Sequence, residues 1–529
     1  MTDIAALTFS GDGTGCKNIK HDSRYITVIP SDNTNPTDYF VGMKTEVNHT
    51  AATQLAGWKA TVDQLCTTYN DSPRGKNRPV ENLRIWDKLT GYLSDHASDQ
   101  KRVSDGLEDV HRNANRELRG RVAVLSEPLS KTTDVLDMKG KEMMDGIGGW
   151  EHWRSLSKTE QAKFGQDLVR ETNIYLGEEV YQRLSPEERR KADLYVWSGC
   201  GMHKDLNTVK GGTDSMAGWW EQSGKTPPVE LMSKFKAQAA AAAPENEDPA
   251  SAKGSGRGAV KVCSLLGALV KHRDPKKGHQ NRFRAFCLRS IGEEIDFPDT
   301  SNTRYQSHAK AATEIIHHLQ LYLDFLQNVG DGKGKRGMNH MEKNVYQGLT
   351  DNATLTELAA LCLYCQAVSI PVVEFIRDPR LKSQNALDLA PFYDQLITYL
   401  EALIENPNLL LGPNASPEEG SFMSKPWKNP EAVTIIQRNQ HLYPHLRPLL
   451  VAFCSGALKT WKRFTKELGP GSKISMLTPE ERYLAFRRPT NDLNEGSLGL
   501  LRLMYRSFPN ITLRSLNSRL MIKFASVFS

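Results

Sequence analysis

The sequence predicts an α/β fold in which a mixed sheet with flanking helices is interrupted by a large all-α insertion domain. Residues 1–95 alternate short β-rich runs with a helix, and the region from residue 263 shows mainly the apolar spacing of helices. The chain has 529 residues, of which 39% are hydrophobic and 25% are charged. This composition is typical of a globular protein that can bury a large core.

The predicted strands and helices follow one another in a definite order. Three β-rich runs come first, and a helix follows from Thr50, where Leu55 and Trp58 begin a series of apolar residues at helical spacing. A fourth run, a long helix and a fifth run come next. The β-rich runs are 5–10, 25–30, 39–47, 90–93 and 194–198. Ser185 and Thr478 each precede Pro-Glu-Glu, which is typical of a capping box that starts a helix.

Composition divides the chain into four parts. An alanine run, followed by a turn-rich sequence with few apolar residues, is typical of a linker. We therefore predict the first part of the sheet-containing core at 1–223, a linker at 224–262, a helical insertion at 263–475, and final core helices at 476–529. The two parts of the core then come from the two ends of the chain.

Basic residues are concentrated in two stretches, although the formal net charge is only +6. Residues 253–289 contain ten basic residues and one acidic residue, and residues 459–523 contain thirteen and five. Charge that is segregated in this way can build a surface that attracts phosphate groups. Two solvated helix faces would have the same composition, so both interpretations stay open.

Cysteine spacing and the N-terminal sequence bear on the compartment. The eight cysteines show no framework spacing, and the N-terminus has no signal-peptide pattern, so we expect a reduced, intracellular protein. The longest apolar runs, such as 358–364, are much shorter than a membrane span. We therefore expect no membrane partner.

Two aspartates stand out by their positions. Asp12 follows the first predicted strand within Gly-Asp-Gly, and Asp95 ends the fourth. If these strands are neighbours, the two carboxylates can face one another and share divalent metal, because Mg²⁺ and Mn²⁺ prefer carboxylate oxygen. An ordinary Gly-Asp-Gly turn is the alternative interpretation.

Six segments, together with this order of elements, carry a resemblance to a known family. They are SGDGT at 10–14, HTAATQLAGW at 49–58, SDHASDQK at 94–101, CGMHKDLN at 200–207, NTRY at 302–305 and PTNDLNEGSLG at 489–499. The chain resembles transposase-derived proteins of the hAT and Kyakuja-Dileera-Zisupton kind that occur in fungal genomes. The resemblance implies a ribonuclease H-like fold with a helical insertion.

The resemblance also implies a catalytic and metal-binding triad. Carried over by motif, the triad consists of Asp12, Asp95 and Glu495, which would hold two Mg²⁺ or Mn²⁺ ions. Glu495 lies at the start of an amphipathic pattern, as expected for a residue that leans toward a sheet edge. Glu357, which is also near a predicted helix start, is the alternative third carboxylate.

Cys200 and His203 form a Cys-x-x-His pair that matches a motif of this family. Structural zinc would require two further ligands. Cys362 and Cys365 have suitable spacing, but they lie in an apolar run that is typical of a core helix. We therefore favour packing or hydrogen bonding over zinc binding for the Cys-x-x-His pair.

A basic segment near the start of the predicted insertion is the candidate DNA contact. Phe283 and Phe286 are interleaved with its basic residues, and neutralisation of the DNA backbone there would be independent of base sequence. The proposed DNA-binding residues are Lys271, Arg273, Lys276, Lys277, Arg282 and Arg284. The resemblance adds Arg304 as a residue near the active site, with surface packing as its alternative role.

The leading hypothesis is a nuclear DNA transposase core that hydrolyses and transfers phosphodiester bonds by two-metal-ion catalysis. The alternative is a catalytically inactive, domesticated nuclear protein that keeps the fold and binds DNA or another protein. Because the sequence opens on the first predicted strand, we expect it to lack the N-terminal zinc-finger module of many relatives. Whether the chain forms a homo-oligomer stays open.

Overall fold

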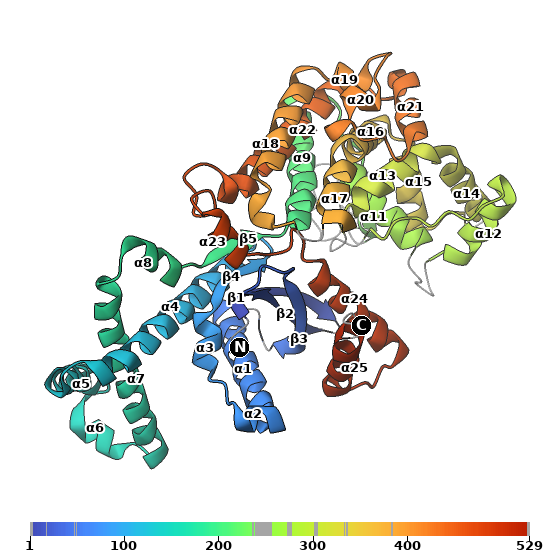
Figure 1. The fold of residues 1–529 in the computed structure, drawn as a ribbon. Helices are drawn as coiled ribbons and strands as arrows, with labels where there is room; N and C mark the ends of the chain where they lie inside the picture. The colour runs from blue at the N-terminus through green and yellow to red at the C-terminus, as the bar shows by residue number, and fades with distance from the viewer. Residues whose placement is uncertain are drawn as a thin grey trace. The chain divides into compact units, whose positions relative to one another are not determined.

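The computed structural model describes residues 4–16, 18–46, 48, 50–234, 237–238, 256–271, 278–300, 305–332, 334, 337–381 and 384–525. Two units divide the chain (Figure 1). Unit 1 comprises Met1–Cys200, Lys382–Leu389 and Glu467–Ser529, and unit 2 comprises Gly201–Leu381 and Ala390–Lys466. Unit 1 therefore unites the two ends of the chain.

A five-stranded mixed sheet forms the centre of unit 1 and confirms the predicted mixed α/β class. Its strands are β1 (Ile4–Cys16), β2 (Ile19–Pro30), β3 (Thr37–Glu46), β4 (Leu89–Ser94) and β5 (Val196–Gly199). The order across the sheet is β3-β2-β1-β4-β5. The β1–β2 and β2–β3 pairs are antiparallel, and the β1–β4 and β4–β5 pairs are parallel. The carboxyl ends of β1, β4 and β5 therefore meet at one edge.

Three helices of unit 1 begin at the residues that the sequence predicts. Thr50 caps the first helix by accepting a hydrogen bond from the Thr53 N–H, and Ser185 and Thr478 both form capping boxes. The helices of unit 1 are α1 (Ala51–Asp71), α2 (Pro73–Asn77), α3 (Asn82–Asp87), α4 (Ser98–Ser126), α5 (Leu129–Gly146), α6 (Gly149–Ser155), α7 (Lys158–Gln182), α8 (Pro186–Ala192), α23 (Pro479–Leu484), α24 (Asp492–Ser507) and α25 (Leu513–Ala525).

One face of the sheet packs against α1, α3 and α4 through aromatic side chains. The Phe9 ring on β1 stacks on Trp58 of α1 at 4.6 Å between centroids, and Trp86 of α3 meets the same ring edge-on at 5.7 Å. Val103 and Leu107 of α4 join this buried cluster. The apolar pattern that predicted α1 is therefore the part of the helix that the sheet buries.

The opposite face is covered by the C-terminal helices. Leu498 and Leu501 of α24, together with Leu516 and Leu520 of α25, form a buried cluster with Met43 of β3. Residues from the last part of the chain therefore contribute to the same core as the first strands.

A buried ion cluster fixes the β2–β3 pair under α1. The Arg24 guanidinium donates to Glu46 at 2.6 Å and to the Thr61 hydroxyl at 2.9 Å, and it lies 3.5 Å from Asp22. A Cβ atom at Gly57 would lie 2.3 Å from Arg24 Nη2. The glycine in the LAGW segment is therefore required by the close approach of this arginine.

A second buried arginine, Arg487, bridges β4 and β5. It donates to the carbonyl oxygens of Tyr92 and Val196, on β4 and β5, at 3.1 and 2.6 Å. A Cβ atom at Gly91 would lie 2.1 Å from Arg487 Nη2. Burial lowers the pKa of the Arg487 guanidinium to about 10, which leaves it charged at neutral pH.

Within its described residues, unit 2 is helical apart from one short strand pair. Its longer helices are α9 (Gly201–Ser223), α11 (Gly258–Val270), α12 (Gln280–Ile291), α13 (Ser307–His317), α14 (Leu319–Asp331), α15 (His340–Thr350), α16 (Asn352–Tyr364), α17 (Ile370–Ile376), α18 (Ala390–Glu405), α21 (Pro430–Arg438) and α22 (Leu446–Thr465), with the short α19 (Asn408–Leu411) and α20 (Pro417–Gly420). The sequence assigned α9 to the core, whereas the structure places it in unit 2.

The predicted linker contains two short strands. β6 (Glu230–Leu231) pairs with β7 (Gly256–Arg257) in antiparallel fashion, and α11 starts within the same predicted linker. Much of the rest of this segment lies outside the described residues.

The most apolar helical stretch runs from Asn352 to Ile376, through α16, a π-helical turn (Cys365–Ser369) and α17. It is long and apolar enough to span a membrane, but 83% of its apolar window is buried inside the structure. The uninterrupted apolar run at 358–364 is short, as the sequence indicates, but the structure joins it to further apolar residues in one continuous helical stretch. Cys362 and Cys365 are fully buried in this stretch, as predicted.

Candidate metal centre

Alternate residues of β1 face the C-terminal segment, and Asp12 belongs to this set. The Thr8 hydroxyl donates to the Phe486 carbonyl at 2.8 Å, and the Ser10 hydroxyl donates to Asn494 Oδ1 at 3.0 Å. The Arg502 guanidinium donates to the Thr14 hydroxyl. Because side chains alternate between the faces of a strand, Asp12 points to the same side as these residues.

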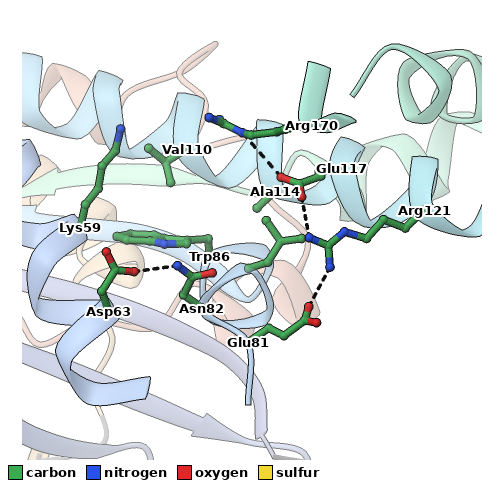
Figure 2. Close-up of a pocket in the computed structure, with 11 residues that line it drawn as sticks. Lys59, Asp63, Glu81, Asn82, Trp86, Val110, Ala114, Glu117, Arg121 and Arg170 are labelled. Carbon is green, nitrogen blue, oxygen red and sulfur yellow. Dashed lines mark hydrogen bonds and ion pairs between the residues drawn. The ribbon is translucent and has the colours of Figure 1, made fainter. Parts of the chain in front are cut away.

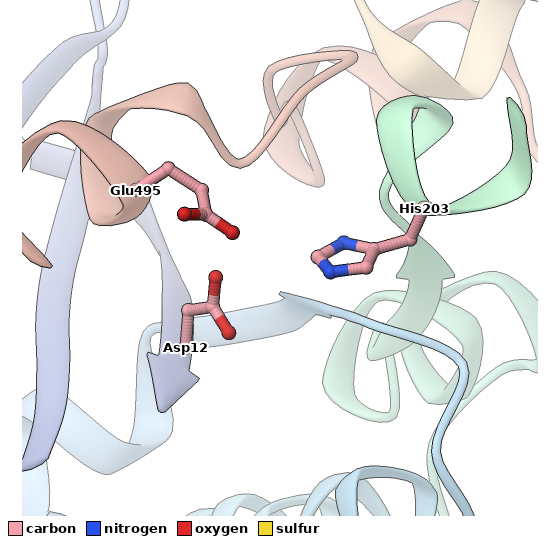
Figure 3. Close-up of side chains that lie close together, drawn as sticks. All are labelled: Asp12, His203 and Glu495. Atoms are coloured by element: carbon pink, nitrogen blue, oxygen red, sulfur yellow. The ribbon is translucent and has the colours of Figure 1, made fainter. Parts of the chain in front are cut away.

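Asp12, which the sequence placed after the first strand, lies within β1, and its side chain approaches that of Glu495 (Figure 3). A carboxylate oxygen of each lies within 4.8 Å of the other, so the structure brings together two of the three residues in the predicted triad. Asp12 Oδ1 accepts the Gly13 N–H at 2.8 Å, and the Glu495 N–H donates to the Asn491 carbonyl at 3.0 Å. Both carboxylates are half-buried. Two adjacent carboxylates fit a divalent cation that prefers oxygen ligands.

His203, also drawn in Figure 3, lies at the start of α9 in unit 2. Because His203 belongs to unit 2, the candidate centre of unit 1 comprises only the carboxylates of Asp12 and Glu495. Within unit 2, the Tyr305 hydroxyl lies 3.2 Å from His203 Nδ1, and the two rings meet edge-on.

Asp95 is held one residue beyond the end of β4. The parallel register pairs Ser10 with Leu93, and the same register continued by two residues places Asp12 beside Asp95. Asp95 Oδ1 accepts the Ala97 N–H at 3.0 Å, in the turn that leads into α4. Asp95 is therefore at the predicted sheet edge, although its ligand atoms are not among those gathered within 4.8 Å of Asp12 and Glu495.

An imidazole and a carboxylate lie at the neighbouring ends of β4 and β5. His96 Nε2 is 3.7 Å from Glu467 Oε2, and the Gly199 N–H donates to Glu467 at 3.1 Å. The His96 ring lies so close to the Gly199 backbone that a Cβ atom there would be 2.0 Å from the ring. Sequence reasoning missed Glu467, because nothing in the Lys-Glu-Leu sequence distinguishes it from a solvated surface residue.

Cys200 and His203 play separate roles in the structure. Cys200 is fully buried at the end of β5, where its Sγ accepts the Asn491 N–H at 3.2 Å. Within the described ranges, no group of three or more His, Cys, Asp or Glu ligand atoms includes Cys200. The observed contact is a hydrogen bond of the kind that the sequence favoured for this cysteine.

Glu357, the alternative third carboxylate, lies inside unit 2. Its Oε1 accepts the Trp220 indole N–H at 2.9 Å, and its Oε2 accepts the Ala259 N–H at 2.9 Å. Burial raises the pKa of the Glu357 carboxyl. Glu357 therefore ties the end of α9 to the start of α11, and Glu495 is the glutamate that approaches Asp12.

The predicted DNA-binding segment is partly neutralised. Lys271 pairs with Asp296, and Arg284 lies 3.7 Å from Glu294. Arg282 donates to Asn328. Arg273, Lys276, Lys277 and Arg304 lie outside the described residues.

The aromatic residues interleaved in that segment pack inside unit 2. Phe283 is 1% exposed and stacks on Tyr322 at 5.2 Å between centroids, and Phe286 contacts Phe325. The Phe283 ring is therefore not presented to the bases of a nucleic acid, whereas Phe286 is partly exposed.

A pocket of about 500 Å³ lies between α1, α3, α4 and α7 (Figure 2). Trp86 lines it, and Arg121 and Arg170, which also line it, pair with glutamates. Arg121 donates to Glu81 and Glu117 at 2.9 and 2.7 Å, and Asn82 donates to Asp63 at 2.6 Å. The arginines that line the pocket are therefore paired, and none of the proposed ligands Asp12, Asp95 and Glu495 lines it.

Comparisons with known proteins add no family assignment. No protein-family model matches the chain, and no curated protein matches it.

Proposed function

We propose that the chain is the ribonuclease H-like core of a DNA transposase, which acts in the nucleus and cleaves and transfers DNA phosphodiester bonds. The sheet order β3-β2-β1-β4-β5 supports this proposal, since it combines an antiparallel meander with two parallel strands. The insertion of a helical unit between the two parts of the core supports it as well.

The single observation that carries the proposal is the approach of Asp12 to Glu495. The two residues come from opposite ends of the chain, and the register of β1 and β4 adds Asp95 at the same edge. Asp12, Asp95 and Glu495 would hold the Mg²⁺ or Mn²⁺ ions. When bound, such ions activate an attacking oxygen and stabilise the leaving oxygen at phosphorus.

The chain itself orients the proposed ligands. The Gly13 N–H fixes one oxygen of Asp12, and the first turn of α24 fixes the backbone of Glu495. Asn494 anchors that turn to the sheet, since its Nδ2 donates to the Ser23 carbonyl at 2.8 Å and its Oδ1 accepts from the Ser10 hydroxyl at 3.0 Å. In the proposed reaction, water attacks phosphorus and breaks its bond to the 3′ oxygen, which leaves a 5′ phosphate and a free 3′ hydroxyl. That hydroxyl then attacks phosphorus in a second strand and displaces the 3′ oxygen of that strand as a hydroxyl.

A basic surface on the C-terminal helices supports DNA as the substrate. Residues 496–525 contain five basic residues and no Asp or Glu. Four of them are exposed and form no ion pair within the part of the chain that the structure describes: Arg506, Arg514, Arg519 and Lys523. These unpaired cations follow the proposed ligand Glu495 in the sequence, and they can contact a phosphate backbone. The basic residues near Lys271 are less suited to that contact, because acidic neighbours already neutralise them.

Cleavage of supercoiled plasmid DNA by the full chain tests the proposal. We expect nicking that requires Mn²⁺ or Mg²⁺, that is lost in Asp12→Asn and Glu495→Gln, and that persists in Asp32→Asn, which changes an exposed aspartate in the β2–β3 turn. DNA binding should survive all three substitutions. If the wild-type chain binds DNA but never nicks it with either metal, the catalytically inactive alternative is correct.

A further inference from the structure

The side chain of Asn491 has no role within the described structure that explains its burial. Asn491 is 1% exposed, and neither its Oδ1 nor its Nδ2 has a hydrogen-bond partner among the described residues. It occupies the N-cap position of α24, where an asparagine oxygen usually accepts a backbone N–H of the first turn, but no such bond forms here. Burying a carboxamide without partners is costly, so such groups in proteins nearly always bind something.

Asn494, in the same motif, provides an internal comparison. It is also 1% exposed, but its oxygen accepts from Ser10 and its nitrogen donates to Ser23, so its structural role is complete. The sequence Asn-Asp-Leu-Asn-Glu thus contains two buried asparagines. Asn494 holds the helix on the sheet, and Asn491 has both polar atoms available.

The backbone of Asn491 connects the proposed ligands. Its carbonyl accepts the Glu495 N–H at 3.0 Å, which places the two residues one helical turn apart. Its own N–H donates to Cys200 Sγ at 3.2 Å. The Cys200 N–H in turn donates to the Ser94 carbonyl at 2.8 Å, and Ser94 directly precedes Asp95. Asn491 therefore lies between the strand end that carries Asp95 and the helix that carries Glu495.

We propose that the Asn491 carboxamide is a fourth ligand group of the Asp12–Glu495 metal centre, with Oδ1 as a neutral oxygen donor. This inference rests on the proposed function, because it requires a cation at that centre. Amide oxygens are ordinary ligands of hard divalent cations alongside carboxylates. A cation would bind the Asn491 Oδ1 atom, which has no hydrogen-bond partner among the described residues. This would explain why that oxygen does not accept a backbone N–H in the first turn of α24.

Mn²⁺ binding to the full chain without DNA tests the inference, followed by the decrease of the free-ion electron paramagnetic resonance signal. We expect Asn491→Ala to weaken Mn²⁺ affinity by about tenfold or more, as loss of a supporting metal-site group does. Asn491→Asp should bind Mn²⁺ more tightly than wild type, because a charged carboxylate oxygen replaces a neutral amide oxygen. Asn494→Ala should instead lower the metal-free melting temperature, since it breaks existing hydrogen bonds.

The outcomes separate this inference from the function on which it rests. If Asp12→Asn abolishes Mn²⁺ binding while Asn491→Ala and Asn491→Asp bind like wild type, Asn491 is not a ligand and the metal centre stands without it. If wild type binds no Mn²⁺, the metal centre and the inference both fail. Should Asn491→Ala not fold, Asn491→Asp decides alone, because unchanged or weaker affinity in that variant overturns the proposal.

Discussion

The carboxylates of Asp12 and Glu495 lie within 4.8 Å of each other, although one residue lies in the first strand and the other in the first turn of α24, near the other end of the chain. The approach of the two carboxylates depends on one face of β1 and on the apolar side of α24, which come from opposite ends of the chain. Alternate residues of β1 contact the segment from Phe486 to Arg502, and α24 packs its apolar side on the sheet.

The first prediction concerns stabilisation of unit 1 by metal. A cation that binds only the folded state stabilises it by mass action, by about 2.7 kcal/mol at a hundredfold excess over the dissociation constant. We expect Mn²⁺ to raise the melting temperature of wild type and of Asp32→Asn relative to EDTA. The rise should be lost in Asp12→Asn and Glu495→Gln. An equal rise in all four proteins would place the cation elsewhere.

The second prediction concerns Gly91. A methyl group there would lie 2.1 Å from Arg487 Nη2 and 2.3 Å from the Val196 carbonyl oxygen, and backbone cannot move aside as a side chain can. We expect Gly91→Ala to lower the free energy of unfolding by about 3 kcal/mol, at the upper end of the overpacking range. A Cβ atom at Gly165 in α7 would meet no neighbouring heavy atom within 4 Å. We therefore expect Gly165→Ala to raise the free energy of unfolding by about 0.5 to 1 kcal/mol, because alanine favours the helix over glycine. Urea denaturation measures both.

The third prediction concerns the buried cation Arg24. Arg24→Met removes the cation shared by Asp22 and Glu46, whose side chains are only 8% exposed. Breaking a buried ion cluster from one side typically costs about 3 to 5 kcal/mol. Arg112→Ala, which breaks exposed pairs on α4, should cost under about 1 kcal/mol. Similar losses in the two variants would show that the Arg24 cluster adds no stability beyond a surface pair.

The fourth prediction concerns stability at low pH. His21 of β2 is fully buried, and neither of its ring nitrogens has a hydrogen-bond partner among the described residues. Burial lowers the pKa of His21 below its ordinary 6.5. Below pH 6.5, His21 binds a proton in the unfolded chain but stays neutral in the folded chain. The free energy of unfolding therefore decreases as the pH falls from 6.5 towards the pKa of folded His21.

Replacing His21 isolates that contribution. We expect His21→Leu to flatten the decline in the free energy of unfolding between pH 7 and pH 5, measured by urea denaturation at each pH. His152→Leu on α6 serves as the matched control, because this histidine is exposed and should leave the slope as it is in wild type. An unchanged slope in His21→Leu would assign the acid sensitivity to other groups.

The sequence contained enough information for the strands, the caps and the order of elements. The apolar residues around Trp58 recur at helical spacing. Thr50 and Ser185 cap helices through backbone N–H groups only three residues away. The β-rich runs form strands whose apolar side chains the helices bury. These signals act over a few residues, so they can be read without knowing the fold. The expected end of the first strand before Asp12 was wrong, because β1 continues through Asp12 to Cys16.

Only the tertiary structure decided which distant residues meet and what their burial means. Glu357 and Glu495 both lie near helix starts, but Glu357 is held by Trp220 and Ala259 while Glu495 approaches Asp12. Asn491 and Asn494 look alike in sequence, and only packing gives one a full set of hydrogen bonds and the other none among the described residues. The physical reason is that hydrogen bonding and desolvation depend on neighbours from the other end of the chain, which local sequence patterns do not specify.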